Sequence, residues 1–443
     1  MSSSVEQIKD RLSIVDVVGA YVTLEKSGSN LRARCPFHNE RTPSFFVSPE
    51  RGTYHCFGCD AGGDIFEFVK SFEGVDFYGA LKILAAKAGV TIERSDPKAR
   101  DEKERLYHVL EEATLFFEKA LAAAPQAEEY LEKRGVTDES RAAWRLGYAP
   151  DEWRGLLSFF LAKGIKEEAL EKTGLVIRTR EGRYYDRFRG RVMFPIADSS
   201  GRIIAFSARL LPIAKESADV SHEAKYINSP ETELYRKSSA LYGFDKAKQA
   251  IREEDACIIV EGQMDVLLTH QAGVKNAVAT SGTALTGEHI GRIRRFTEKI
   301  VFAFDADAAG LSATERGLKL ALKEGMEVRL AHLPHGMDPA DLGARAPKDL
   351  AERLKNARHA VDFFLTVLEE TISDPRRRKI ETGKKVLPLI VRMKNRIEQA
   401  HFITETARGR RRRGLFKKYG TRDGGAPRGA IADNRRTFLS ARA

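Results

Sequence analysis

Residues 256–280 read ACIIVEGQMDVLLTHQAGVKNAVAT and set the architecture of the chain. Two short apolar runs, ACIIV and NAVAT, enclose a helical segment, and the alternation continues through KIVFAFD, a helix around residues 312–324, and EVRLAHL. Strands that alternate with helices in this way predict a parallel sheet covered by helices. We therefore expect an α/β unit over residues 251–343.

Acidic residues follow the predicted strands at their carboxyl ends. Glu261 comes directly after the first strand, Asp305 and Asp307 end KIVFAFDAD, and Asp338 follows the last strand. Ligand sites of open α/β sheets lie at such strand ends. Like charges gathered there are hard to keep ionised without divalent cations, and carboxylate oxygens suit Mg2+. The set predicts a magnesium site, although a solvated acid or a helix N-cap is the alternative for any one of them.

A second pattern lies near the N-terminus. Cys35-x2-His38 is followed, after 17 residues, by Cys56-x2-Cys59. The two pairs supply three thiolates and one imidazole, the donor set of a tetrahedral zinc site. Because four protein ligands leave no open position for a water molecule, we expect one structural zinc ion. The alternative is three buried thiols beside an unrelated histidine, which needs both spacings to arise by chance.

Basic and aromatic residues surround this cysteine cluster. Such a mixture suits contact with a single-stranded nucleic acid through charge and stacking. The other interpretation is that Phe45, Phe46, Tyr54 and Phe57 form the small core around the metal, and we favour it for most of these rings.

Composition excludes some classes of protein. The chain has 443 residues, 42% of them hydrophobic, and no run of 18 apolar residues, which predicts several folded domains in the cytoplasm and no membrane partner. The net charge is +11, and +10 of it comes from residues 408–443, which hold 12 Lys or Arg and 2 Asp. The first 407 residues hold 62 basic and 61 acidic groups. Any nucleic-acid binding by the folded body must therefore rest on local clusters.

Shifts in composition divide the chain. A charged stretch separates residues 1–98, the zinc-binding unit, from residues 107–250, where helices mix with turn-rich strands and Ser200-Gly201 predicts a hairpin. We expect residues 347–407 to be helical throughout and residues 408–443 to form a basic disordered tail. The expected class is multi-domain α+β, with a zinc-ribbon-type N-terminal domain, a mixed α/β basic subdomain, a parallel-sheet α/β subdomain and a helical C-terminal subdomain.

Together these motifs resemble the bacterial DNA primase family. The acids at the strand ends look like those of a TOPRIM domain. CPFHNERTPSFFVSPERGTYHCFGC, YDRFRGRVMFPIADSSGRIIAFSAR and KYINSPETELYRKSSALYGF are similar to primase blocks and stand in family order, so that the resemblance runs from about residue 5 to 406. It implies a TOPRIM polymerase core that makes short RNA primers for DNA replication. The substrates would be a single-stranded DNA template and ribonucleoside triphosphates, joined by Mg2+-dependent nucleotidyl transfer.

The resemblance also implies roles for single residues. Glu261, Asp305 and Asp307 would bind two or more Mg2+ ions, with Asp265 and Asp338 completing the acidic patch and Glu261 as an alternative general base. The residues expected along the path of nucleotide and template are Arg187, Arg189, Arg191, Arg209, Lys225, Tyr226, Asn228 and Lys237. An ordinary polar surface is the alternative for this second set.

This chain departs from the family pattern in two places, after the last predicted strand and at its C-terminal end. Asp338-Pro339-Ala340-Asp341 stands where the family has Asp-Pro-Asp. The family also continues into a helical domain that docks on the replicative helicase, whereas the resemblance here stops near Thr406. We expect the tail beyond it to be a truncated or out-of-frame end, or else to add sequence-independent affinity for DNA.

Two other classes of function stay open. A topoisomerase or nuclease could share the TOPRIM acids, but no tyrosine lies in a recognisable strand-cleaving context and the primase blocks would have no explanation. A non-catalytic single-strand-binding protein would leave the complete set of acids without a role.

Overall fold

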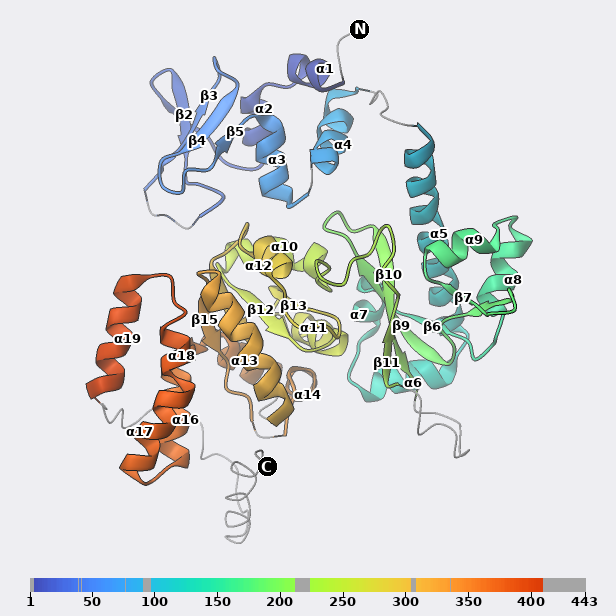
Figure 1. Ribbon diagram of the computed structural model, residues 1–443. Helices are drawn as coiled ribbons and strands as arrows, with labels where there is room; N and C mark the ends of the chain where they lie inside the picture. The colour runs from blue at the N-terminus through green and yellow to red at the C-terminus, as the bar shows by residue number, and fades with distance from the viewer. Residues whose placement is uncertain are drawn as a thin grey trace.

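The computed structural model describes residues 4–38, 40, 42–75, 77–90, 97–211, 224–303, 308–334 and 336–408. Three sheet-containing units and a set of C-terminal helices follow one another along the chain (Figure 1). No helix in the described part is both long and apolar enough to span a membrane.

The N-terminal unit packs helices against an antiparallel sheet of order β1-β2-β3-β4-β5. Its elements are α1 (Ser4–Arg11), α2 (Ile14–Gly19), β1 (Glu25–Ser27), β2 (Asn30–Ala33), β3 (Phe45–Ser48), β4 (Thr53–Cys56), β5 (Gly62–Gly63), α3 (Ile65–Glu73) and α4 (Phe77–Ala88). Burial alternates along β3 and β4, so that Phe45, Val47 and Tyr54 face the buried helical residues. The Asp64 carboxylate caps α3 by accepting the backbone N–H groups of Phe66 and Glu67.

The second unit is built on an antiparallel sheet of order β11-β10-β9-β6. Its elements are α5 (Pro97–Ala122), α6 (Pro125–Lys133), α7 (Asp138–Ala143), β6 (Gly147–Ala149), α8 (Gly155–Ala162), α9 (Glu167–Lys172), β7 (Val176–Arg178), β8 (Tyr184–Asp186), β9 (Arg191–Ala197), β10 (Ile203–Leu210), β11 (Tyr226–Asn228) and α10 (Phe244–Glu253). The predicted hairpin at Ser200-Gly201 is confirmed between β9 and β10. The Asp198 carboxylate fixes this turn by accepting the N–H groups of Ser200 and Arg202.

The predicted parallel sheet is also confirmed, with the order β13-β12-β14-β15-β16. Its elements are β12 (Cys257–Val260), α11 (Gln263–Gln271), β13 (Ala277–Ala279), α12 (Gly287–Ile293), β14 (Lys299–Phe302), α13 (Ala308–Lys323), β15 (Glu327–Leu330), α14 (Pro339–Arg345), α15 (Pro347–Lys355) and β16 (Arg358–His359). Alternate residues of β12 face opposite cores: Ile258 packs with α11 and α14, and Ile259 packs with α13. Cys257 is fully buried, as expected for a small apolar side chain.

One hydrophobic core joins the second unit to the parallel sheet. Val192 and Phe194 of β9 belong to the same buried cluster as Val260 and Met264. A β-bridge between Tyr242 and Ala279 adds a backbone link to the edge strand β13. Because the two sheets share a core, the end of β11 is held at a fixed place beside the carboxyl ends of the parallel strands.

The C-terminal helices are α16 (Ala360–Thr371), α17 (Pro375–Lys385), α18 (Leu387–Ile390) and α19 (Arg396–Arg408). The prediction of helix throughout residues 347–407 is wrong at Arg358 and His359, which pair antiparallel with β15 as β16. This short strand covers the edge that β15 would otherwise expose. The predicted disordered tail lies outside the described residues except for Arg408, which ends α19.

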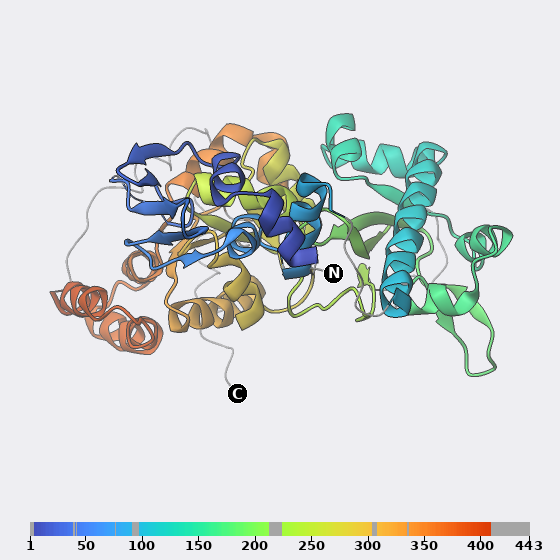
Figure 2. The ribbon, with the colours of Figure 1, turned by 90° about the horizontal axis from the view of Figure 1, so that it is seen from above.

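The N-terminal unit lies against α10, on the side of the parallel sheet that carries α10 and α12 (Figures 1 and 2). The Lys248 ammonium donates to the Glu73 carboxylate at 2.9 Å, and the Arg252 guanidinium donates to the carbonyl oxygen of Phe72 at 2.6 Å. The same guanidinium lies over the rings of Phe72 and Phe296. At Gly74 a Cβ would lie 2.6 Å from the Phe296 ring, so only glycine permits this close approach.

A buried histidine in α11 predicts a pH dependence of stability. The His270 side chain bonds the carbonyl oxygen of Ala277 at 2.9 Å and packs edge-on against Trp144. Burial lowers the pKa of His270 to about 4, whereas an unfolded histidine titrates near pH 6.5. Below pH 6.5 the unfolded state therefore binds a proton that the folded state does not, and the free energy of unfolding falls as the pH falls toward 4.

We expect His270 to contribute a loss of about 3 kcal/mol across that interval. The free energy of unfolding of His270→Gln, measured in urea between pH 7 and pH 4.5, should depend less on pH than that of the wild type. The exposed His108, changed to Gln, is the matched control and should keep the wild-type slope. Equal slopes for His270→Gln and the wild type would contradict the assignment.

Candidate metal centre and active site

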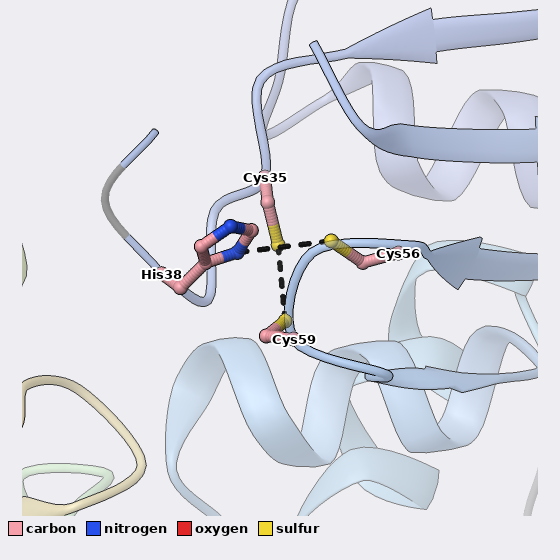
Figure 3. A group of neighbouring side chains, drawn as sticks. All are labelled: Cys35, His38, Cys56 and Cys59. Carbon is pink, nitrogen blue, oxygen red and sulfur yellow. Dashed lines mark hydrogen bonds between the residues drawn. The ribbon is translucent and has the colours of Figure 1, made fainter. Parts of the chain in front are cut away.

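The four predicted zinc ligands converge on one point (Figure 3). Their donor atoms all lie within 4.8 Å of one another. Cys35 Sγ lies 3.7 Å from Cys59 Sγ, and Cys56 Sγ lies 3.7 Å from His38 Nδ1. A tetrahedral zinc ion with Zn–S distances of about 2.3 Å has ligand separations of about 3.8 Å. The donor set and its size therefore fit zinc.

Tight turns after β2 and β4 aim these donors. The backbone N–H groups of Phe37 and Gly58 each lie 3.3 Å from the sulfur of the cysteine two residues earlier, Cys35 and Cys56. A Cβ at Gly58 would lie 2.5 Å from His38 Nε2, so the second turn requires glycine. Burial raises the pKa of Cys35, which disfavours its thiolate unless a cation is bound.

Glu40 supports the centre and was not predicted from the sequence. Its carboxylate accepts the backbone N–H groups of Cys35 at 2.6 Å and Ser44 at 3.0 Å, and lies 3.3 Å from His38 Nε2. Partners of this kind orient a histidine ligand and raise its basicity. The residue lies outside the ligand spacing, so no motif signals it.

The aromatic residues around the zinc centre divide into two groups. Phe45 and Tyr54 are buried in the core, as predicted, whereas Phe46 is only partly buried. Phe57 is 75% exposed, and its ring contacts those of Phe46 and His55 at centroid distances of 5.5 and 4.8 Å. This exposed cluster offers faces on which a base can stack.

The acids at the strand ends occupy different environments. Glu261 is exposed directly after β12. Asp265, in the first turn of α11, is only 8% exposed, and its carboxylate accepts the N–H groups of Gly262 at 2.9 Å and Ala340 at 3.3 Å. Asp338 caps α14 by accepting the N–H of Asp341 at 2.6 Å. Asp305 and Asp307 lie outside the described residues.

Electrostatics links three of these acids. Burial, and then the charges of Asp338 and Glu261, raise the pKa of Asp265 to about 7. The carboxylates are thus close enough to oppose one another's ionisation, which is the situation that a divalent cation relieves. Among the described residues, these three acids do not converge as tightly as the zinc ligands do. The residues present fit a Mg2+ site that would also use the acids after β14.

Several of the predicted nucleotide and template residues gather where β10 and β11 approach the parallel sheet. Arg209 donates to the Tyr226 hydroxyl at 2.8 Å and lies over the rings of Tyr130 and Tyr226. Asn228 donates to the carbonyl oxygen of Ser281 at 2.7 Å, in the loop after β13. The charge of Asp265 is among the causes that raise the pKa of Tyr226, after burial, so this end of β11 lies near the acids.

Lys225 and Lys237 are held in place by different contacts of their backbone carbonyl groups. Lys225 is exposed, and its carbonyl oxygen accepts the N–H of Leu210. Lys237 is held through its carbonyl oxygen, which lies 3.1 Å from Nε2 of the fully buried His289, while Nδ1 of that ring accepts the N–H of Thr286. Burial lowers the pKa of His289, consistent with the neutral ring that these two bonds require. His289 was missed because a buried histidine in a helix carries no sequence signal.

The three predicted arginines after β8 do not form one patch. Arg191 is 5% exposed and donates to the carbonyl oxygen of Ala224, which gives it a structural role. Burial lowers the pKa of Arg187. Arg189 donates to the carbonyl oxygen of Asp186 and lies 4.2 Å from the centre of the Trp153 ring, which is 65% exposed. Trp153 was missed by the sequence analysis, and its only signal is a tryptophan in a charged loop.

The zinc centre predicts a metal-dependent fold for the N-terminal unit. Cys59→Ser removes one of four ligands, so the chain should lose its zinc and the unfolding transition of this unit, because structural zinc sites contribute folding free energy directly. Zinc content by mass spectrometry and a thermal scan measure both. Cys257→Ala changes the buried thiol outside the centre and should keep one zinc ion per chain. A Cys59→Ser chain with wild-type zinc content would refute the assignment.

Comparisons with known proteins agree with this geometry. Three family models match: "CHC2 zinc finger" over residues 1–100, "DNA primase catalytic core, N-terminal domain" over residues 116–248, and "Toprim-like" over residues 258–343. They confirm the expected zinc-ribbon-type and TOPRIM units.

Known relatives and solved structures give the same result. A DNA primase of Halalkalibacterium halodurans is 37% identical over 91% of this chain and 68% of its own length. The zinc-binding and RNA polymerase domains of the Aquifex aeolicus primase are 30% identical, with 95% of this chain and 98% of that one covered and a TM-score of 0.61. A DnaG primase catalytic domain bound to ssDNA is 31% identical, with 70% and 97% covered and a TM-score of 0.59.

The chain spans 55% to 68% of the length of curated DNA primases that it matches. Sequence identity, coverage and fold nevertheless agree across the zinc-binding, core and Toprim units. This chain belongs to the bacterial DNA primase family.

Proposed function

We propose that this chain is a DNA-directed RNA polymerase that synthesises short RNA primers on single-stranded DNA by Mg2+-dependent nucleotidyl transfer. The observation that carries the proposal is the shared core, which holds the cationic end of β10 and β11 beside the acids of the parallel sheet. A triphosphate needs both: cations for its charge, and acids that hold the metal ions of phosphoryl transfer. The solved structure of a related catalytic domain with ssDNA supports a DNA template.

Glu261, Asp305 and Asp307 are the residues that would hold Mg2+. When bound, the ion neutralises charge on the triphosphate and assists attack of a 3′-hydroxyl on the α-phosphate with loss of pyrophosphate. Asp265 would support this site indirectly, because both of its carboxylate oxygens accept backbone N–H groups. Its bonds to Gly262 and Ala340 fix the turn that presents Glu261 and the start of the helix capped by Asp338.

The remaining predicted residues would position the substrates. Arg209, Lys225 and Lys237 supply positive charge for triphosphate or template phosphates, and the Asn228 amide joins β11 to the loop after β13. Arg189 and Trp153 combine a cation with an exposed ring, which suits a single strand. Both residues lie in loops at the end of β8, where the N–H of Asp186 donates to the carbonyl oxygen of Trp153.

Incorporation of labelled ribonucleotides on a single-stranded DNA template with Mg2+ tests the activity. Glu261→Ala should lower the rate at least about 100-fold, because a metal ligand contributes several kcal/mol to the transition state. Template binding should persist. Glu254→Ala removes another exposed carboxylate and should keep the wild-type rate. Equal rates for Glu261→Ala and the wild type would overturn the proposal, and binding without incorporation by the wild type would favour a non-catalytic single-strand-binding protein.

The zinc-binding unit is proposed to contact the template through the exposed ring of Phe57. Phe57→Ala should weaken single-strand binding about tenfold, since one base–aromatic stack contributes about 1–3 kcal/mol. Fluorescence anisotropy with labelled ssDNA measures the change, and zinc content should stay at one ion. Phe77, a 49% exposed phenylalanine of α4, is the matched control. A normal affinity of Phe57→Ala would remove this surface from the template path.

A further inference from the structure

The C-terminal helices carry a concentrated positive charge that neither the zinc centre nor the acidic site uses. Residues 376–396 hold one acid, Glu381, and nine cations, which we call the basic face: Arg376, Arg377, Arg378, Lys379, Lys384, Lys385, Arg392, Lys394 and Arg396. The rest of the first 407 residues hold 53 basic and 60 acidic groups. The cationic excess of the folded body therefore lies in this one segment.

Folding alone does not account for this distribution. No residue of α17 is buried, and the helix is held by its neighbours, since Val386, Leu389 and Ile390 just after it enter the core. Arg376 and Arg377 occupy its first turn, where the helix dipole disfavours cations. Asp374 caps this end through their backbone N–H groups. The arrangement costs stability through repulsion between like charges.

Glu381 is the one carboxylate within residues 376–396. Glu381 lies 2.9 Å from the Lys384 ammonium. Arg392 and Lys394 donate to backbone carbonyl oxygens of Pro388 and Glu324. Within the described part of the chain, no ion pair joins the first four cations of α17 to a carboxylate. A solvated helix without a partner normally mixes both signs of charge, so this face fits a polyanion.

The side chains of the basic face also restrict which polyanion it fits. No aromatic residue lies between residues 373 and 400, so bases have no ring to stack on, in contrast to Phe57 and Trp153. Binding through phosphates alone suits a duplex, whose bases are paired and whose backbone faces outward. At about 1.5 Å per residue, the 11 residues of α17 extend over about 16 Å, close to half a turn of duplex.

We propose that the basic face binds the phosphate backbone of the template–primer duplex. This inference rests on the proposed function, because a primer polymerase produces such a duplex beside its acidic site. The exposed rings near Phe57 and Trp153 would engage the unpaired template, whereas the basic face would engage the paired product. The chain would thus have two nucleic-acid surfaces of different chemistry.

Binding of a preformed RNA–DNA duplex by the full chain tests the proposal without any need for catalysis. The variant is Arg376→Gln with Arg377→Gln and Lys379→Gln, and the control is Lys133→Gln with Lys348→Gln and Lys355→Gln, which are exposed cations of α6 and α15. We expect the variant to bind at least tenfold more weakly at about 0.1 M salt, with the slope of log K against log salt smaller by about 2 to 3. The control should resemble the wild type.

Stability and specificity complete the test. Because the substitutions remove repulsion between like charges, the melting temperature of the Gln variant should not fall. A second variant, Arg376→Lys with Arg377→Lys, keeps both charges and should bind duplex as the wild type does. Unchanged duplex affinity in the Gln variant would overturn this proposal. It would not contradict the proposed function, which ribonucleotide incorporation tests separately. A larger loss of affinity for single-stranded DNA than for duplex would assign the basic face to the template. Charge-dependent binding to phosphatidylglycerol vesicles without binding to duplex would assign it to a membrane surface. Either result would reject the duplex as its partner.

Discussion

The buried carboxylate of Asp265 is the interaction on which the acidic site depends. It accepts one N–H from the turn that follows β12 and one from Ala340 in the first turn of α14, 75 residues further along the chain than Asp265. Burial and neighbouring carboxylates raise its pKa to about 7, so that holding the charge in place costs free energy. That cost is offset by the two backbone bonds and, in the proposed function, by bound Mg2+. The position of Glu261 relative to Asp338 follows from this single side chain.

The zinc centre plays the corresponding part in the N-terminal unit. Its sheet consists of strands of two to four residues, too short to be stable by themselves, and the four ligands tie the turns after β2 and β4 together. Glu40 fixes the geometry by bonding both a ligand-bearing turn and the backbone of Ser44. Lys248 and Arg252 on α10 then hold this unit against the second unit through the end of α3.

Charge is distributed in the same local manner. The folded body is almost neutral, yet cations collect at the end of β10 and β11 and on α17, and acids collect at the strand ends. Exposed charges are screened beyond about 10 Å at ordinary salt, so each cluster acts mainly on groups that lie close to it. In the proposed function, each cluster would contact a different part of one nucleic-acid substrate.

The sequence by itself determined the zinc ligands, the parallel sheet and the order of the domains. Ligand spacing and the alternation of strand and helix are local patterns. Glu261 directly follows the apolar strand CIIV, so the sequence alone places it at the carboxyl end of that strand. The resemblance to primases added the roles expected of Arg209, Tyr226, Asn228 and Lys237, which hydrophobic periodicity does not predict.

Only the tertiary structure decided what each side chain contacts. Arg189 and Arg191 are two residues apart in one basic run, yet their contacts differ because β9 begins at Arg191. Arg191 is buried and donates to the carbonyl oxygen of Ala224, whereas the Arg189 guanidinium lies over the Trp153 ring. Glu40, His289 and the two-residue strand β16 were missed for the same reason: their partners lie in other segments of the chain. Burial, and with it the raised pKa of Asp265, depends on how distant elements pack, and that information exists only once the chain has folded.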